Sequence, residues 1–110
     1  MLTVSGNKIT LTRGDTLTLL IALTKGSQTY TPEPTDSIRF AIARGYVGEA
    51  AYDLKISATV PNDTLTVIIS AEQTKALAYG TYNYDVEITH DDGTVDTVIS
   101  STITITGEVK

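Results

Sequence analysis

The chain has no cysteine and no tryptophan, and only one histidine and one phenylalanine among its 110 residues. The lack of cysteine excludes disulfide bonds, thiolate metal sites and cysteine nucleophiles. Thirteen acidic against eight basic residues give a formal net charge of −5. Because nucleic-acid binding depends on clustered Lys and Arg that neutralise phosphates, this balance argues against a nucleic-acid partner.

The chain also shows no segment that would direct it to a membrane or an export pathway. The residues after Met1 lack a basic start, an apolar stretch and a small-residue cleavage site. The longest nearly apolar run, Leu19–Leu23, is far shorter than the roughly 20 residues that span a bilayer. We therefore expect no membrane partner and no signal peptide, in a protein that is made in the cytoplasm.

Residues that branch at Cβ dominate what is present. The sequence contains twenty Thr, and Ile and Val together add nineteen more. Branching at Cβ stiffens the side chain and suits a pleated, half-buried strand better than a helix. With 41% hydrophobic residues and this length, we expect one all-β domain over residues 1–110.

Alternation of apolar and polar side chains marks about seven strands, because successive side chains of a strand point to opposite faces. The runs are residues 8–12, 16–24, 37–44, 52–58, 64–70, 82–88 and 94–106. In the last run, Val95, Ile99, Ile103 and Ile105 are expected on one face, with a bulge at Ser100–Ser101. Turn residues separate the runs, the strongest turn being Asp91-Asp92-Gly93.

One short helix is expected between the strands. Ser70 and Gln73 have the spacing of a capping box, in which each side chain satisfies a free backbone amide of the first turn. The helix is predicted near residues 71–78 and should stop before Gly80.

A tyrosine pattern narrows the fold class. Immunoglobulin-type sandwiches carry a tyrosine near the start of the sixth strand, two residues before a cysteine. The segment Gly80-x-Tyr82-x-Tyr84 places Tyr82 at such a structural tyrosine corner and Tyr84 where the cysteine would stand. We therefore expect an immunoglobulin-like β-sandwich of about seven antiparallel strands, held together by packing alone.

Candidate catalytic and metal-binding groups are few. The one histidine, His90, adjoins a charged turn and is expected to be solvated rather than to act as a base. Asp85 with Glu87 is expected on a solvated face, and Asp91-Asp92-Gly93 lacks the closing glutamate of a calcium loop. We expect no enzymatic activity, no catalytic residue, no cofactor and no metal.

With catalysis and metal binding set aside, we expect the chain to act through contact with another molecule. Leu20 interrupts a polar face, and Tyr30, Tyr46 and Tyr52 lie in or next to loops, so these four residues are predicted to form the contact surface. Tyrosines in such places also cover the ends of a sandwich. An alternative function is binding of cell-wall carbohydrate or of a host surface protein, although the aromatic platform preferred for sugars, tryptophan, is missing.

Several segments together resemble a known group of proteins. They are residues 7–16, 30–32, 36–41, 63–65, 74–77, 80–86 and 93–97. The chain resembles small phage and prophage proteins of Gram-positive bacteria, immunoglobulin-like and similar to baseplate or tail-fibre N-terminal domains. This resemblance implies a virion structural protein of the baseplate, tail or neck, assembled in the bacterial cytoplasm. Its implied partners are other virion proteins, or further copies of itself.

Overall fold

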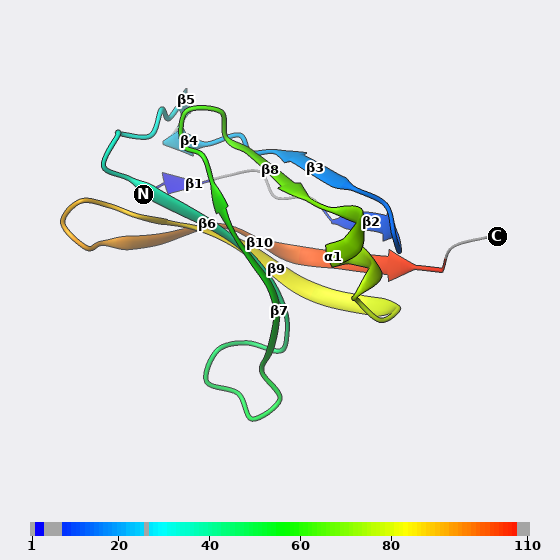
Figure 1. Cartoon of the computed structure of the whole chain (residues 1–110). Helices are drawn as coiled ribbons and strands as arrows, with labels where there is room; N and C mark the ends of the chain where they lie inside the picture. The colour runs from blue at the N-terminus through cyan, green and yellow to red at the C-terminus, as the bar shows by residue number, and fades with distance from the viewer. Residues whose placement is uncertain (1, 4–7, 26, 108–110) are drawn as a thin grey trace.

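The computed structural model describes residues 2–3, 8–25 and 27–107 (Figure 1). Within them lie ten strands and one helix, in this order: β1 (Leu2–Thr3), β2 (Ile9–Thr12), β3 (Leu17–Leu20), β4 (Thr24–Lys25), β5 (Gln28–Thr29), β6 (Ser37–Arg44), β7 (Asp53–Val60), β8 (Thr66–Ile69), α1 (Ala71–Lys75), β9 (Gly80–Thr89) and β10 (Val95–Thr106).

The strands form a sandwich. One layer is a five-stranded sheet with the order β2-β10-β9-β6-β7, and the facing layer contains the antiparallel pair β3-β8. Figure 1 shows β3 and β8 lying over one face of the larger sheet, with α1 leading from β8 to β9. A small sheet, β1-β4-β5, lies near one end. Seven of the described strands have four residues or more, so the expected all-β sandwich is confirmed.

One pairing differs from the expected antiparallel arrangement. β2 runs parallel to β10, with Ile9 opposite Ile103. The turn at Arg13-Gly14-Asp15 carries the chain from β2 directly into β3 of the other layer, and the Asp15 amide donates to the Thr12 carbonyl at 3.0 Å. Because β2 is not joined to β10 by a hairpin, nothing in the connection forces the two strands to be antiparallel.

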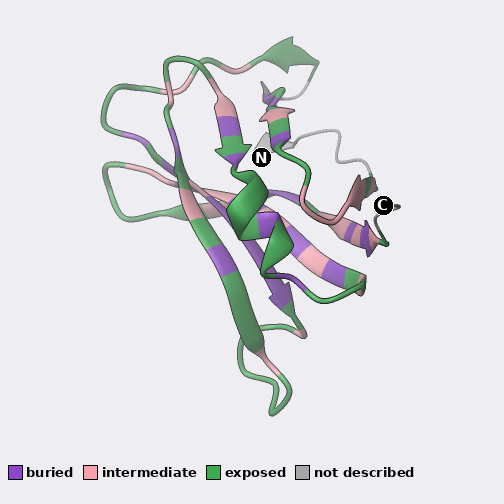
Figure 2. Ribbon diagram, turned by 45° about the vertical axis from the view of Figure 1, so that its right-hand side comes forward, coloured by how far each residue is buried: buried purple, intermediate pink, exposed green. Residues whose placement is uncertain are grey.

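The core lies between the two layers and is mainly aliphatic. Figure 2 shows buried positions alternating with more exposed ones along the strands, as half-buried strands require. Each fully buried side chain of this size contributes about 1.5–3 kcal/mol relative to an exposed one. The largest buried side chains are Tyr82, Phe40, Leu23, Ile38, Ile42, Ile69, Ile88, Ile103, Ile105, Val60, Val67 and Val86.

The bulge in β10 lies earlier than the sequence predicted. Pairing with β9 shifts between Thr97 and Ile99, not at Ser100–Ser101. The extra residue reverses the alternation, so Val95 before it is 53% exposed, whereas Val98 and Ile99 are both buried. Val95 therefore does not share a face with Ile99, which corrects the predicted register.

The helix begins as predicted and ends early. Ser70 Oγ accepts from the Gln73 amide at 3.2 Å, and Gln73 Oε1 accepts from the Ser70 amide at 3.1 Å. The helix ends at Lys75 rather than near residue 78, because Leu77 turns into the core, where it is 4% exposed. No helix in the described residues has the length and hydrophobicity of a membrane span.

The predicted strand over residues 16–24 is also shorter than expected. β3 ends at Leu20, and the next amide, that of Ile21, donates to the Leu65 carbonyl at 2.8 Å. Leu65 has a positive φ of 53°, which points its carbonyl out of the regular ladder. The chain then leaves the β3-β8 pair and forms the separate strand β4.

Candidate functional site

A pocket of about 80 Å³ lies on the outer face of the five-stranded sheet, the face turned away from β3 and β8. Its sheet side is formed by positions that alternate with core residues. Ala41 of β6, Asp85 of β9 and Ser100 of β10 lie side by side in the register of the three strands. The small side chains of Ala41 and Ala43 leave the space that the pocket occupies.

The other side of the pocket is the loop between β6 and β7, which projects from the sandwich in Figure 1. Two turns shape this loop, with the Glu49 amide donating to the Tyr46 carbonyl at 3.0 Å and the Tyr52 amide to the Glu49 carbonyl at 3.1 Å. Tyr46 and Val47 are 58% and 80% exposed and line the pocket together with Tyr52. The Tyr46 hydroxyl also donates to Asn83 Oδ1 at 3.4 Å, which connects the loop to β9.

Charged groups of both signs lie beside the pocket. Arg39 Nη2 lies 3.1 Å from Glu87 Oε1, its cross-strand neighbour. Burial, together with the nearby Glu87 carboxylate, raises the pKa of Asp85 above its ordinary value, and the Arg39 guanidinium opposes that rise. Arg39 Nε and Asp85 Oδ1 are buried and lack a hydrogen-bond partner in the part of the chain that the structure describes.

The structure brings two of the four predicted contact residues together. Tyr46 and Tyr52 both line the pocket. Leu20 is 75% exposed on β3, in the other layer of the sandwich. Tyr30 is half-buried, and its hydroxyl donates to Asp36 Oδ2 at 2.7 Å, so its polar end is engaged within the protein.

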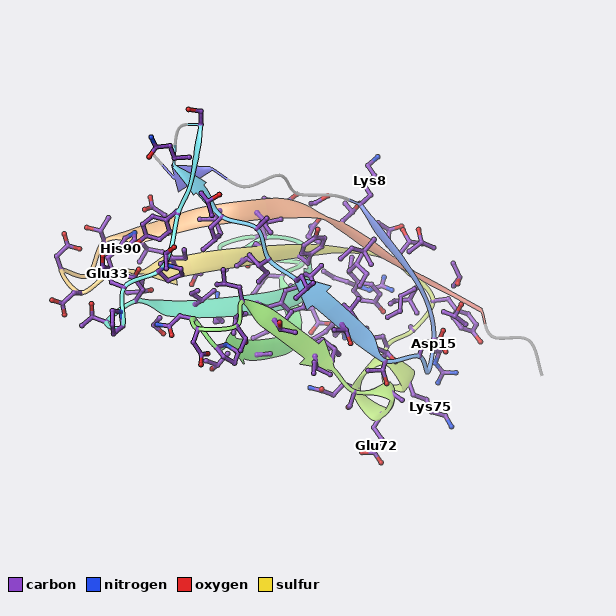
Figure 3. The ribbon with its side chains drawn as sticks, turned by 90° about the horizontal axis from the view of Figure 1, so that it is seen from above. Lys8, Asp15, Glu33, Glu72, Lys75 and His90 are labelled. Atoms are coloured by element: carbon purple, nitrogen blue, oxygen red, sulfur yellow. The ribbon has the colours of Figure 1, made fainter. Side chains whose placement is uncertain are left out.

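His90 is not the solvated turn residue that the sequence predicted. Its side chain is 25% exposed, with Nδ1 3.0 Å from Asp36 Oδ1 and Nε2 2.9 Å from Asp96 Oδ2. Figure 3 shows His90 close to Glu33 at one end of the sandwich. Hydrogen bonds to Asp96 and Asp36 raise the pKa of His90, and burial partly opposes them. Because carboxylates occupy both ring nitrogens, neither nitrogen is available as a base toward a hydroxyl group.

Asp36 is the buried centre of this cluster, at 7% exposure. Burial alone would raise its pKa, but hydrogen bonds from Tyr30, the Glu33 amide and His90 hold the pKa below its ordinary value. The hydrogen bond that Tyr30 donates to Asp36 raises the pKa of Tyr30 to about 12. The arrangement stabilises a charged carboxylate and ties three segments together.

Sequence reasoning missed this cluster because its members are far apart in the chain. The signal that could have found it is the register in which Ser37 of β6 pairs with Thr89 of β9, since this places Asp36 beside His90. Alternation alone identifies both strands but does not determine their register.

Tyr82 occupies the position predicted for the structural tyrosine corner. It is 1% exposed, and its hydroxyl donates to the Ala78 carbonyl at 2.7 Å, four residues upstream. The Arg44 guanidinium lies 4.6 Å from the centre of the Tyr82 ring, a cation–π contact at the end of β6. Tyr84, two residues later, packs against Phe40 with ring centres 5.7 Å apart.

No group of three or more His, Asp or Glu side chains in the described ranges is arranged to hold a metal ion.

Among the described residues, the pocket on the outer face combines the features of a binding site, namely concavity, exposed aromatic rings and a few polar groups.

No protein-family model and no curated protein matches the chain. Among solved structures, it is similar to the fibronectin(III)-like modules of CbhA from Clostridium thermocellum, with 20% identity over 100% of this chain and 99% of that chain and a TM-score of 0.53. It is also similar to SGBP-B of the mixed-linkage glucan utilization locus of Bacteroides ovatus, solved with a mixed-linkage heptasaccharide. That match has 13% identity over 97% of this chain but 21% of that chain, with a TM-score of 0.52. The fold is therefore an immunoglobulin-like β-sandwich of the kind seen in fibronectin(III)-like modules.

Proposed function

We propose that the chain is a non-enzymatic structural domain of a phage or prophage particle, in the baseplate, tail or neck, and that it acts through protein–protein contacts. The observation that carries this proposal is a pair of large apolar side chains exposed on the smaller layer, Leu20 at 75% and Ile68 at 63%. The resemblance of the sequence to phage structural proteins is the reason for assigning the domain to a phage or prophage particle. A particle protein of this kind is assembled in the bacterial cytoplasm.

Leu20 and Ile68 form one patch. In the β3-β8 pair, Leu20 is opposite Thr66 and Thr18 is opposite Ile68, so the two apolar residues are diagonal neighbours on the same face. Diagonal neighbours of an antiparallel pair lie within reach of each other's side chains. We call this surface the Leu20–Ile68 patch. A partner that covers this patch removes its apolar surface from water, which lowers the free energy of the complex.

A contact through this face is favoured over addition of a strand at the edge of the large sheet. β7 is one edge of that sheet, and it begins with the exposed charged pair Asp53 and Lys55, whose Oδ2 and Nζ lie 2.6 Å apart. Charged side chains on edge strands discourage pairing with another strand. The partner surface is therefore expected to be apolar and to meet side chains rather than backbone.

The test is incorporation of the chain into purified particles. Leu20→Asp should keep the chain folded, because the residue is exposed, and should exclude it from particles that incorporate the wild-type chain. Leu54→Asp is the matched control, since Leu54 is also exposed, at 43%, but lies on β7. Particles that lack the wild-type chain, or that incorporate Leu20→Asp as well as wild type, contradict the proposal.

Carbohydrate binding is a second candidate function, and the pocket on the outer face favours it. Tyr46 and Tyr52 line this pocket with polar groups close by, and tyrosine rings offer an apolar surface with a polar end. A segment of SGBP-B, 21% of that chain, shares the fold, and SGBP-B was solved in complex with a heptasaccharide. The pocket and the Leu20–Ile68 patch lie on different layers of the sandwich, so the two functions are compatible.

Titration calorimetry of the whole chain with oligosaccharides tests this second function. Saturable binding that is lost in Tyr46→Ala supports it. Tyr79→Ala is the control, because Tyr79 is 56% exposed, nearly the same as Tyr46, and is not part of the pocket lining. Failure of every oligosaccharide to bind, or equal loss of binding in both variants, contradicts it.

A further inference from the structure

β8 is an edge strand of the smaller layer. Among the described residues, no strand pairs with the edge of β8 that faces away from β3. β8 contacts β7, the edge strand of the larger sheet. Ala58 of β7 faces the core, opposite Phe40, but is only half-buried, so the smaller layer does not cover β7 completely. The smaller layer therefore ends at β8, on the side where the larger sheet continues to β7.

The register of the β3-β8 pair determines which backbone groups of β8 point outward. The Ile21 amide donates to the Leu65 carbonyl at 2.8 Å, and these two residues continue the register of the pair. Hydrogen-bonded pairs alternate with non-hydrogen-bonded pairs in an antiparallel ladder, so Val67, two positions after Leu65, also bonds to β3. The residues on either side of it, Thr66 and Ile68, therefore direct their N–H and C=O groups away from β3.

The sequence of β8 contains no residue that discourages pairing with another strand. Thr66–Ile69 are all branched at Cβ, and residues 64–70 include no charged residue, proline or glycine. Edge strands commonly carry charged residues or proline, which hinder pairing with another chain. β7, at the edge of the larger sheet, has Asp53 and Lys55 in this role. The edge of β8 is instead suited to accept a strand.

The composition of β8 favours an identical strand as its partner. Uncharged segments of high β-propensity without proline or glycine are the segments that pair with copies of themselves. The chain has a formal net charge of −5, so two copies repel each other over much of their surfaces. At the edge of β8, two copies meet without like charges placed opposite each other in the strands.

Antiparallel pairing of two β8 strands about a two-fold axis at Val67 engages the outward backbone groups of both copies. Thr66 of each copy is then opposite Ile68 of the other, and the two residues of each such pair exchange both N–H···O=C bonds. The Ile68 side chains, each 63% exposed in the single chain, become diagonal neighbours on the outer face. Because both copies use the same edge, the assembly closes at two copies.

We propose that the edge of β8 is a dimerisation site, where a second copy of this chain adds its own β8 to form one continuous sheet with the order β3-β8-β8-β3. This inference rests on the protein–protein function proposed above and names one partner. The two Leu20–Ile68 patches lie on the same outer face of the joined sheet, where they remain accessible to another protein of the particle.

Sedimentation equilibrium of the whole chain tests dimerisation. The interface is small, so we expect weak association with a Kd of about 0.1–1 mM and a weight-average mass that rises toward that of two chains. Because both copies are acidic, association should strengthen when NaCl is raised from about 20 to 200 mM. A chain that stays monomeric up to about 1 mM, a mass that exceeds two chains, or association that weakens with salt overturns the proposal.

Amide exchange with solvent, measured by NMR, tests whether the dimer forms at this edge. The amides of Thr66 and Ile68 should exchange about twofold to fivefold more slowly at about 1 mM chain than in dilute solution, in proportion to the fraction of dimer. The Val67 amide, which bonds to β3, should change much less. Exchange at Thr66 and Ile68 that does not depend on concentration overturns the proposal.

Two matched pairs of variants separate the edge of β8 from the outer face of the β3-β8 pair. Thr66→Pro removes an outward N–H from β8, and Thr18→Pro removes the equivalent N–H from β3. Ile68→Asp places a carboxylate beside its symmetry mate, and Leu20→Asp places one on β3 in the same patch. The β8 variant of each pair should raise the Kd of the dimer about tenfold or more, whereas the β3 variant should dimerise like wild type.

Circular dichroism and urea midpoints confirm that each variant is folded, and the aspartate pair decides the test if a proline variant does not fold. Equal weakening by both members of a folded pair, or an unchanged Kd in the β8 variant, overturns the proposal.

The outcomes separate this inference from the function on which it rests. If the chain stays monomeric but particles incorporate wild type and exclude Leu20→Asp, the inference is wrong and the proposed function stands. If the chain dimerises through β8 and particles do not incorporate it, the dimer stands and the assignment to a particle is wrong.

Discussion

Nδ1 of His90 lies 3.0 Å from Oδ1 of Asp36, although 54 positions separate the two residues in the chain. The pairing of β6 with β9 brings them together, and Asp96 on β10 engages the second ring nitrogen of His90 at 2.9 Å. Tyr30 and Asn62 complete the surroundings, Tyr30 through the Asp36 carboxylate and Asn62 through the Asp36 carbonyl at 3.0 Å. One histidine thus holds three segments at this end of the sandwich.

This cluster makes stability depend on pH. The pKa of His90 is raised in the folded chain, so its contribution is fully present below about pH 6.5 and is lost as the pH rises through the folded-state pKa. The pKa of Asp36 is lowered, so its contribution is present above about pH 4 and is lost as the pH falls through its folded-state pKa. We expect the free energy of unfolding, measured in urea at constant ionic strength, to decrease as the pH rises above about 6.5.

The control for this pH dependence is His90→Gln, which cannot titrate. Its free energy of unfolding should change less than that of wild type over the same pH range, and the two curves should differ most at acidic pH. Parallel curves for the two proteins would show that groups other than His90 control the decrease.

Tyr82→Phe should lower the free energy of unfolding by about 1 kcal/mol, the usual net contribution of a hydrogen bond. The Tyr82 hydroxyl donates to the Ala78 carbonyl at 2.7 Å at a buried position, and phenylalanine leaves that carbonyl without this donor. Urea unfolding should show a lower midpoint with an unchanged slope. Tyr79→Phe, at an exposed position, should change stability by less than about 0.5 kcal/mol. An unchanged midpoint in Tyr82→Phe would argue against a tyrosine corner.

Much of the fold could be predicted from local patterns, and the errors arise where long-range pairing decides the outcome. Alternation located the long strands because one face of each is buried, as in β6, where Ile38, Phe40 and Ile42 face the core. The parallel pairing of β2 with β10 and the bulge between Thr97 and Ile99 depend on contacts across the sheet. The alternation of apolar and polar residues along a single strand does not reveal which strand it pairs with or in which register.

The candidate site was only partly predictable for the same reason. Tyr46 and Tyr52 were recognisable as loop tyrosines, and the loop between β6 and β7 keeps them together. Asp85 and Arg39 are on neighbouring strands and reach the pocket through the register of these strands, whereas the sequence pattern predicts Asp85, together with Glu87, on a solvated face. The partial burial of Asp85 on the outer face can be predicted only when the position of the loop between β6 and β7 is known.

Ser70→Ala should lower the free energy of unfolding by about 1 kcal/mol, because it removes the N-cap of α1. Ser70 Oγ accepts from the Gln73 amide at 3.2 Å, and alanine leaves that amide without this partner. Ser57→Ala, at an exposed position of β7, is the control and should stay within about 0.5 kcal/mol of wild type. Equal effects of the two substitutions in urea unfolding would mean that the cap contributes nothing.

Gly45→Ala should destabilise the chain more than Gly48→Ala, although both glycines belong to the loop beside the pocket. Their φ angles are +74° and +92°, so alanine at either position is strained by about 1–2 kcal/mol. A Cβ at Gly45 would also lie 3.1 Å from the Ala51 carbonyl oxygen, a backbone atom, whereas a Cβ at Gly48 meets no atom within 4 Å among the described residues. The additional crowding falls on Gly45→Ala alone and can be relieved only by moving the backbone before Tyr52. Urea midpoints of the two variants measure the difference, and equal midpoints would show that the loop adjusts without cost at Ala51.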